Sequence, residues 1–242
     1  MVNSRESKMP HEARHEPLLG KDKSGGSTMN AVHQGEHPPK RELPVNIIEL
    51  EKQVILMEDI QEIENLQKRY GYYFEIGNYQ GVVDLFSEDA ESVEIESCGL
   101  FLGKAGVKKM YVDTIGSNKY ESWVRFCIQM MGGVVDVDPI GKTAKGRWQT
   151  WLCEAMPVGG VPRQQWLHGY YENVFVKEHG RWLFKKLHWN VTFYTSFEAG
   201  WVRIPLLGLL TMKMADAPPT AFHPYPSGYH VPYHYIHPIT GE

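Results

Sequence analysis

Cysteine, clustered basic residues and long apolar runs are all scarce in this chain of 242 residues. The three cysteines, Cys98, Cys127 and Cys153, are too few and too scattered for a disulfide framework or a zinc knuckle, and they favour a reducing compartment. The formal net charge is −4, and Lys and Arg form no block along the sequence. Nucleic acid is therefore not expected as a partner, because binding to phosphates requires clustered positive charge.

No stretch of the sequence suits a secretory signal or a membrane span. The N-terminus has no apolar run. The longest apolar run, Ile204–Leu210, is far too short to cross a bilayer and is interrupted by Pro205 and Gly208. We therefore expect a soluble, cytoplasmic protein with no membrane partner.

Composition divides the chain into three parts. Residues 1–43 are polar, rich in Gly, Ser, His, Pro and Lys, and lack periodicity, which predicts a disordered tail. Residues 44–200 carry the patterns of one folded domain, and a hydrophobic content of 42% is enough for a sizeable core. Residues 201–242 join the apolar segment to a tail rich in Pro, His and Tyr.

The first part of the folded domain reads as helices. Apolar residues recur at helical spacing from Asn46 to Gly77, which predicts a long helix with a break near Glu58-Asp59. The first half of this helix is apolar on more than one side, which suggests packing against another subunit. A second helix is expected at Tyr79–Phe86. Two short strands, Glu91–Glu96 and Gly99–Leu102, are expected next, followed by a helix at Lys104–Ile115.

From residue 122 onward the pattern is that of β-strands. Strands are expected at Ser122–Val137 and Thr143–Met156, and Gly132-Gly133 predicts a bulge or bend in the first of them. A long hairpin follows, from Gln164 to Tyr194. Helices followed by an antiparallel meander indicate an α+β fold, in which the N-terminal helices cover one face of a curved sheet.

The hairpin is expected to turn at Glu178-His179-Gly180, a three-residue loop with Gly180 in the left-handed conformation. This loop pairs Lys177 with Arg181 and places apolar residues opposite apolar ones and acids opposite bases. A two-residue loop would place Glu172 opposite an apolar residue, so it is the less favourable choice.

With that register, one face of the hairpin combines aromatic and polar side chains. His168 is expected opposite Asn190, Tyr170 opposite His188, and Trp166 opposite Thr192, with Tyr194 one step beyond. Aromatic residues mixed with a few convergent polar groups are typical of a ligand pocket. A core histidine that is hydrogen-bonded by a neighbour explains the pattern equally well. The opposite face is apolar and is expected to be the outer one, buried in a homotrimer or homodimer; it carries Leu167, Tyr171, Trp189 and Phe193.

The chain resembles the SnoaL-like proteins of the nuclear transport factor 2-like superfamily. The segments LQKRYGYYFEIGNYQGVVDLFSEDA and GKAGVKKMY resemble the opening of these proteins, and GRWLFKKLHW resembles their closing strand pair. The likeness runs from Ile47 to about Phe197. It implies a cone-shaped α+β barrel, in which helices close over a strongly curved antiparallel sheet and the ligand lies inside.

Two enzyme groups of this superfamily are the most similar. One is scytalone dehydratase. The resemblance places its pocket histidine at His168, the serine that faces this histidine at Asn190, and its helical carboxylate at Glu75. This sequence departs from scytalone dehydratase at Phe74, where that enzyme has a tyrosine, and in Phe126–Gln129, which lacks the second pocket histidine. The more similar group contains the bacterial diarylpropane lyase, with the shared pattern YEN-V-KE-G-W-KKLHW and a Pro-Tyr-His tail. Both resemblances imply an elimination from a hydroxylated aromatic compound, releasing formaldehyde or water, without a cofactor.

Such a lyase needs a general acid, a general base and an enclosed aromatic cavity. The residues expected to act in catalysis are His168, Glu75, Tyr73 and Asn190. Those expected to bind the substrate are Arg147, Trp151, Trp166, Tyr170, His188, Thr192 and Tyr194. Arg147 has a second interpretation, an ion pair with Glu172. A non-catalytic binding or assembly module of the same fold is the alternative function, and an isomerase or hydrolase is a third.

The tail contains four histidines: His223, His230, His234 and His237. Interspersed prolines prevent the helix that would bring such histidines onto one face, so no metal site is expected. An extended tail rich in proline and aromatic residues more often docks across a sheet or a neighbouring subunit.

Overall fold

The computed structural model describes residues 46–118, 121–158, 160–206, 212–236 and 239–241. The predicted disordered tail, residues 1–43, lies outside the described residues, as does much of the apolar segment 204–210. In the described part of the chain, none of the helices combines the length and the apolar character that crossing a membrane would require.

Helix α1 (Ile47–Glu75) begins at Asn46, whose side chain accepts a hydrogen bond from the Glu49 N–H. The predicted break near Glu58-Asp59 is wrong, because α1 is continuous there. Asp59 is buried; its carboxylate pairs with Lys177 and accepts a hydrogen bond from Trp182 Nε1 at 2.9 Å. Asp59 therefore fastens the helix to the hairpin instead of ending the helix.

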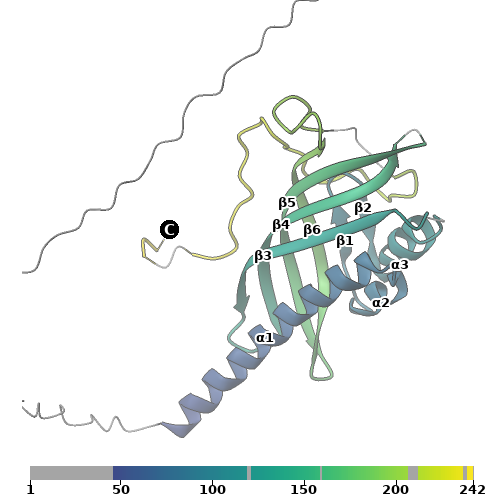
Figure 1. Ribbon diagram of the computed structural model, residues 1–242. Helices are drawn as coiled ribbons and strands as arrows, with labels where there is room; N and C mark the ends of the chain where they lie inside the picture. The colour runs from purple at the N-terminus through teal and green to yellow at the C-terminus, as the bar shows by residue number, and fades with distance from the viewer. Residues whose placement is uncertain (1–45, 119–120, 159, 207–211, 237–238, 242) are drawn as a thin grey trace, which may run out of the picture. The chain divides into compact units, whose positions relative to one another are not determined.

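Two shorter helical segments follow, and both agree with the predicted positions. Helix α2 spans Tyr79–Asp84, and α3 spans Gly103–Lys108. The chain continues from α3 as a π-helical segment, η1 (Lys109–Ile115), which buries Met110 and Tyr111. These segments pack on the same side of the sheet as the end of α1 (Figure 1).

The sheet has six strands in the order β2-β1-β6-β5-β4-β3. Neighbours are antiparallel except β1 and β6, which are parallel. The strand bounds are β1 Ser92–Ile95, β2 Gly99–Leu102, β3 Arg125–Val137, β4 Thr143–Val158, β5 Val161–Glu178 and β6 Arg181–Ser196. The predicted α+β fold, with N-terminal helices over a curved sheet, is confirmed (Figure 1). We call the helix-covered side the inner face and the other side the outer face.

The hairpin turns in two residues, so the predicted three-residue loop is wrong. Glu178 pairs with Arg181, and both loop residues, His179 and Gly180, have positive φ values of 49° and 76°. Such a turn matches the right-handed twist of the strands. A two-residue loop was expected to place Glu172 opposite Leu187. That pairing does not occur, because the register shifts between Val174 and Phe175, before Glu172 is reached.

These bulges also change every predicted partner at the far end of the hairpin. The register shifts between Val174 and Phe175 and again between His168 and Gly169. The observed pairs are His168 with Phe193, Tyr170 with Asn190 and Trp166 with Thr195, in place of the predicted Asn190, His188 and Thr192. At Gly169 a Cβ would meet the Asn190 carbonyl and the Trp189 ring, so only glycine permits this approach.

The predicted assignment of the two faces is wrong for Leu167, Tyr171 and Trp189 and correct for Phe193. Leu167, Tyr171 and Trp189 belong to the hydrophobic core on the inner face, whereas they were expected outside. His168 and Phe193 stack on each other on the outer face, at a ring-centroid distance of 5.4 Å. The bulge that contains Thr192 turns Tyr194 to the inner face, away from the residues with which it was predicted to lie.

The bulge predicted at Gly132-Gly133 is confirmed. The pairing of β3 with β4 shifts between Met131 and Val134, and Gly132 has a positive φ of 57°. A Cβ on Gly133 would collide with the Trp148 indole. The sheet therefore bends at this point around a buried tryptophan.

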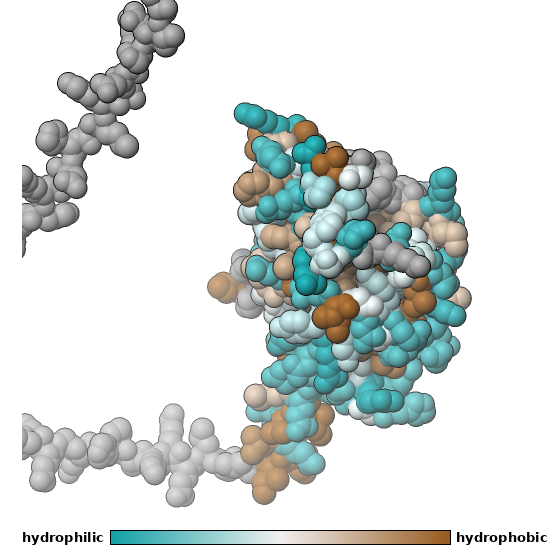
Figure 2. All heavy atoms as spheres, turned by 45° about the vertical axis from the view of Figure 1, so that its right-hand side comes forward, coloured by the Kyte–Doolittle hydropathy of each residue, from teal (hydrophilic) through white to brown (hydrophobic). Residues whose placement is uncertain are grey.

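Exposed apolar side chains gather at the start of α1 (Figure 2). Ile47 is 75% exposed and Met57 is 69% exposed, and the other members of the group are Ile48, Leu50, Val54, Ile55 and Leu56. Of the four residues whose exposure was the reason to expect a homotrimer or homodimer, Leu167, Tyr171 and Trp189 lie on the inner face. The oligomer stays a prediction, and this group is the surface that now supports it.

Residues 212–236 pass along the edge strand β2 and then across the outer face. The Asp216 carboxylate accepts from the Leu102 N–H at 2.8 Å, and the Thr220 N–H and hydroxyl both donate to Glu94. Further on, the Tyr225 N–H donates to the Thr192 carbonyl at 2.7 Å. The prediction that the C-terminal tail docks across a sheet is confirmed for these residues.

Candidate functional site

An inner cavity of about 160 Å³ lies between α1, η1 and the inner face of the sheet. Its walls are mostly aromatic and apolar side chains, with a few polar groups among them. The lining residues on which the following argument depends are Tyr70, Cys98, Tyr111, Glu154, Tyr171, Trp189, Tyr194 and Met212. A mostly apolar space with a few convergent polar groups is the usual form of a small-molecule site.

Three of the lining residues are buried tyrosines that lie next to one another. The hydroxyl oxygens of Tyr70 and Tyr111 are 3.0 Å apart, and the Tyr171 ring meets Tyr70 edge to face. Burial raises the pKa of all three phenols well above the usual value. They therefore stay neutral and present hydroxyl groups that donate or accept hydrogen bonds.

Glu154 is the one carboxyl group among the described residues that line this cavity. Strand β4 places it on the inner face beside Leu152, and it is 9% exposed. The Tyr194 hydroxyl lies 2.7 Å from Glu154 Oε1 and 3.0 Å from Gln165 Oε1. Burial raises the pKa of Glu154 to about 7, against the hydrogen bond from Tyr194, which lowers it.

A carboxyl group with this pKa takes up and releases protons at neutral pH, which general acid–base chemistry requires. Tyr194 is not the titrating partner, because burial raises its pKa far above neutrality. Cys98 is also an unsuitable nucleophile: burial raises the pKa of its thiol to about 11, so the reactive thiolate is scarce. Glu154 is thus the cavity group best suited to move a proton, and Tyr194 orients it.

His168 was predicted as the proton-transfer residue, but the structure places it on the outer face. Its ring is sandwiched among Trp151, Tyr170 and Phe193, and its Nε2 lies 2.9 Å from Gln149 Nε2. Burial lowers its pKa, so the ring is neutral at pH 7. These contacts match the alternative interpretation of a packed histidine bonded by a neighbour.

Glu75 and Tyr73 were predicted to complete the catalytic group from α1. Glu75 is half-buried, and its carboxylate accepts a hydrogen bond from the Ile128 N–H on the edge strand β3. Tyr73 is partly buried against the core. Neither is among the described residues that line the inner cavity.

The predicted substrate-binding residues separate into groups. Tyr194 lines the inner cavity, whereas Arg147, Tyr170, Thr192 and the predicted catalytic Asn190 line a second cavity on the outer face. The remaining three also lie outside: Trp151 and Trp166 meet edge to face at 5.0 Å, and His188 Nε2 lies 3.6 Å from Glu94 and 3.7 Å from Glu96. The ion pair of Arg147 with Glu172, given as its second interpretation, is present.

The sequence pattern around Glu154 also indicates a functional residue, although Glu154 was not among the predicted site residues. It is a lone acidic residue in the strand segment Trp151-Leu152-Cys153-Glu154-Ala155-Met156, where alternation gives it the face of Leu152. A carboxylate on an apolar face is either paired or functional. The tyrosines Tyr70, Tyr111 and Tyr171 read as ordinary core residues, and only the fold brings their hydroxyls together.

The described residues contain no group of three His, Cys, Asp or Glu side chains that is arranged to hold a metal ion. Among the tail histidines, His234 instead bonds Glu172 Oε2 through Nδ1 at 2.8 Å. His237 lies outside the described residues.

Comparison with known proteins identifies the family and the fold. The sequence profile of the family described as SnoaL-like domain matches residues 56–188. A search of curated protein sequences gives no significant match.

Several solved structures share the fold. One is a protein of Novosphingobium aromaticivorans DSM 12444 provisionally named a scytalone dehydratase, with 18% identity, a TM-score of 0.52, and coverage of 64% of this chain and 97% of that one. Hexachlorocyclohexane dehydrochlorinase LinA type 2 has 14% identity and a TM-score of 0.53 over 60% of this chain and 93% of its own. LinA type 3 of Novosphingobium barchaimii LL02 has 12% identity, a TM-score of 0.51 and coverage of 60% and 94%.

Proposed function

Because this chain belongs to the SnoaL-like domain family, we propose that it is a cofactor-independent lyase that acts on a hydroxylated aromatic small molecule in the inner cavity. The observation that carries the proposal is the buried Glu154 carboxyl, with a pKa raised to about 7, beside the Tyr194 hydroxyl. The structural relatives named for dehydration and dehydrochlorination support it, because both reactions are eliminations.

The volume of the cavity limits the substrate. About 160 Å³ is close to the roughly 150 Å³ of an engineered protein cavity that binds benzene, so it suits one aromatic ring. The neutral hydroxyls of Tyr70, Tyr111 and Tyr171 suit a phenol or carbonyl oxygen on that ring. A second ring would require more space, which Met156 and Met212 of the lining could provide because their side chains are unbranched and adaptable.

Glu154 performs the proton transfers of the proposed reaction. As a carboxylate it removes the proton from the carbon next to the one that bears the departing hydroxyl. The electron pair of that C–H bond forms the C=C bond, the C–O bond breaks, and the proton returns from Glu154 to the leaving oxygen, which departs as water.

In a substrate that carries a hydroxymethyl group, Glu154 would promote the cleavage of a C–C bond instead. Glu154 removes the proton of the hydroxymethyl O–H, the C–C bond breaks to release formaldehyde, and the electron pair forms the C=C bond as the neighbouring hydroxyl leaves. That hydroxyl takes the proton from Glu154 and departs as water. Tyr194 keeps the carboxyl group in place in both versions through its hydrogen bond.

The test is a screen of phenolic alcohols with one or two aromatic rings. Formaldehyde release and the absorbance of the new conjugated double bond are measured with the full-length protein. We expect turnover of at least one compound and its loss in Glu154→Gln, with Glu88→Gln on the exposed surface as the matched control. Binding without turnover by the unmodified protein would instead support the non-catalytic binding module.

A further inference from the structure

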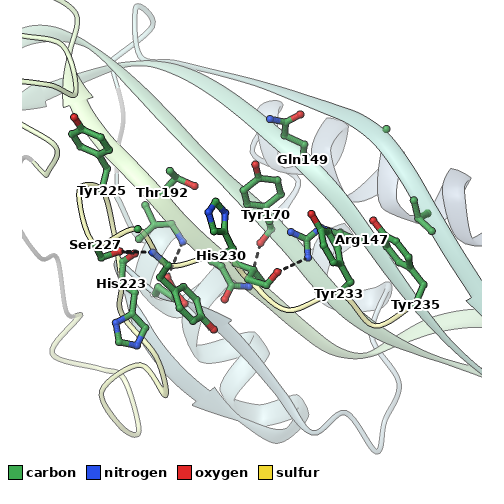
Figure 3. A pocket seen from close by; sticks show the side chains of 18 residues that line it. Arg147, Gln149, Tyr170, Thr192, His223, Tyr225, Ser227, His230, Tyr233 and Tyr235 are labelled. Atoms are coloured by element: carbon green, nitrogen blue, oxygen red, sulfur yellow. Dashed lines mark hydrogen bonds between the residues drawn. The ribbon is translucent and has the colours of Figure 1, made fainter. Parts of the chain in front are cut away.

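The outer cavity is larger than the inner one, at about 440 Å³. Its floor is the outer face of strands β3 to β6, and its other wall is the tail that crosses them (Figure 3). This volume lies within the range of roughly 300–1,000 Å³ that is usual for small-molecule pockets.

Arg147 joins the tail to the sheet through hydrogen bonds that all start from one atom, Nη1. Its guanidinium pairs with Glu172 and donates to the carbonyls of Val231 and Pro232, each at 3.2 Å. Its Cζ lies 4.7 Å from the Tyr170 ring centroid and 4.6 Å from that of Tyr233, on the tail. Figure 3 shows Arg147 between these two rings. An anionic ligand would therefore compete with Glu172 for the one arginine or lysine among the described lining residues.

The other polar groups of the lining are mostly neutral and have spare hydrogen-bonding capacity. In the described part of the chain, the hydroxyls of Tyr170 and Thr192 have no hydrogen-bond partner, and Asn190 makes only a long 3.4 Å bond to the Tyr170 carbonyl. The buried carboxylate of Glu96 also lines the cavity. One of its oxygens accepts from the Val191 N–H at 2.8 Å, and the other lies 3.7 Å from His188 Nε2.

We propose that the outer cavity binds a small neutral saccharide. A carboxylate, amides and hydroxyls are complementary to the many hydroxyl groups of a sugar, since each sugar hydroxyl both donates and accepts. The tyrosine rings of the floor and of the tail offer apolar faces for the C–H side of a sugar ring. Phosphorylated or carboxylated compounds are disfavoured, because Glu96 repels them and Arg147 is already paired.

The experiment measures saccharide binding to the full-length protein by ligand-observed NMR and calorimetry. The probes are methyl glucoside, methyl galactoside, cellobiose and lactose, with inorganic phosphate and benzylamine for comparison. We expect saturable binding of at least one saccharide. Tyr170→Phe and Thr192→Val each remove a hydroxyl with little change of size, and each should weaken binding by about 2- to 10-fold, the effect of one hydrogen bond.

Tyr72→Phe is the matched control, because Tyr72 is 68% exposed on α1 and should leave the affinity unchanged. Saccharide binding that persists in Glu154→Gln separates this proposal from the proposed lyase, which that variant disables. Absence of saccharide binding, preference for phosphate or benzylamine, or affinity unchanged in both folded Tyr170→Phe and Thr192→Val proteins would overturn it. A melting curve of each variant shows that it is folded.

Discussion

The inner and outer cavities lie on opposite faces of the same strands and differ in the chemistry of their walls. The inner one is covered by helices, is lined mostly by aromatic and other apolar side chains, and contains Glu154, whose pKa burial raises to about 7. The outer one is closed by the tail, and its arginine is paired with Glu172. Burial on the inner face raises the pKa of a carboxyl group to the range that general acid–base catalysis requires, whereas the outer cavity pairs its arginine and leaves neutral hydroxyl and amide groups for recognition.

The largest expected effect is on turnover and concerns the inner cavity. Glu154→Gln keeps the size of the side chain and its contact with Tyr194 but cannot take up a proton. Once a substrate has been found, the catalytic rate should fall by about 10²–10⁴-fold, the range for general acid–base catalysis. The rate of the unmodified protein should rise with pH through about 7, as Glu154 becomes the base. A variant with full activity would remove Glu154 from the mechanism.

The same residue should link stability to pH. Its folded-state pKa is raised from 4.5 to about 7, so the folded protein binds this proton more tightly than the unfolded chain. The resulting stabilisation is complete below pH 4.5 and is lost as the pH rises through 7. It amounts to about 3 kcal/mol at 1.36 kcal/mol per pKa unit.

Denaturant unfolding at pH 5 and pH 9 measures this contribution of Glu154 to the free energy of unfolding. The difference in free energy of unfolding between the two pH values should shrink in Glu154→Gln, and the variant should be the more stable protein at pH 9. Identical pH dependence in the two proteins would contradict the raised pKa.

His168→Asn distinguishes the two faces directly. The variant loses the ring that stacks on Phe193 and contacts Trp151 and Tyr170, so the free energy of unfolding should fall by about 1–2 kcal/mol. Turnover by the folded protein should be retained, because the ring lies on the outer face. A loss of rate with unchanged melting temperature would restore the original prediction of His168 as the catalytic residue.

The smallest expected effect concerns the attachment of the tail. Arg147→Lys keeps the positive charge but loses the planar group that lies between Tyr170 and Tyr233, at a cost of about 1 kcal/mol. Hydrogen exchange of residues 222–235 should accelerate, while that of the inner-face strands stays the same. Lys145→Arg is a control on the same strand. Unchanged exchange in the tail would show that its other contacts hold it without Arg147.

The sequence was sufficient to predict the class of fold and the order of its elements. Periodicity located α1, the short strands and the long hairpin within a few residues, because burial of one side of a helix or strand imposes a 3.6- or 2-residue repeat. The bulge at Gly132-Gly133 was also predicted, since paired glycines in a strand have a specific structural meaning. The likeness of the segments around Tyr73 and Trp182 to SnoaL-like proteins indicated the family.

The tertiary structure decided which residues form each cavity. Alternation shows that His168 and Leu167 lie on opposite faces, but it does not show which face the helices cover. The two-residue turn and the bulges at Lys185 and Thr192 depend on how the whole ladder packs, and they moved Tyr194 inside and left Phe193 outside. The pKa of Glu154 likewise depends on burial by residues distant in the sequence, because desolvation of a carboxylate is a property of its complete surroundings.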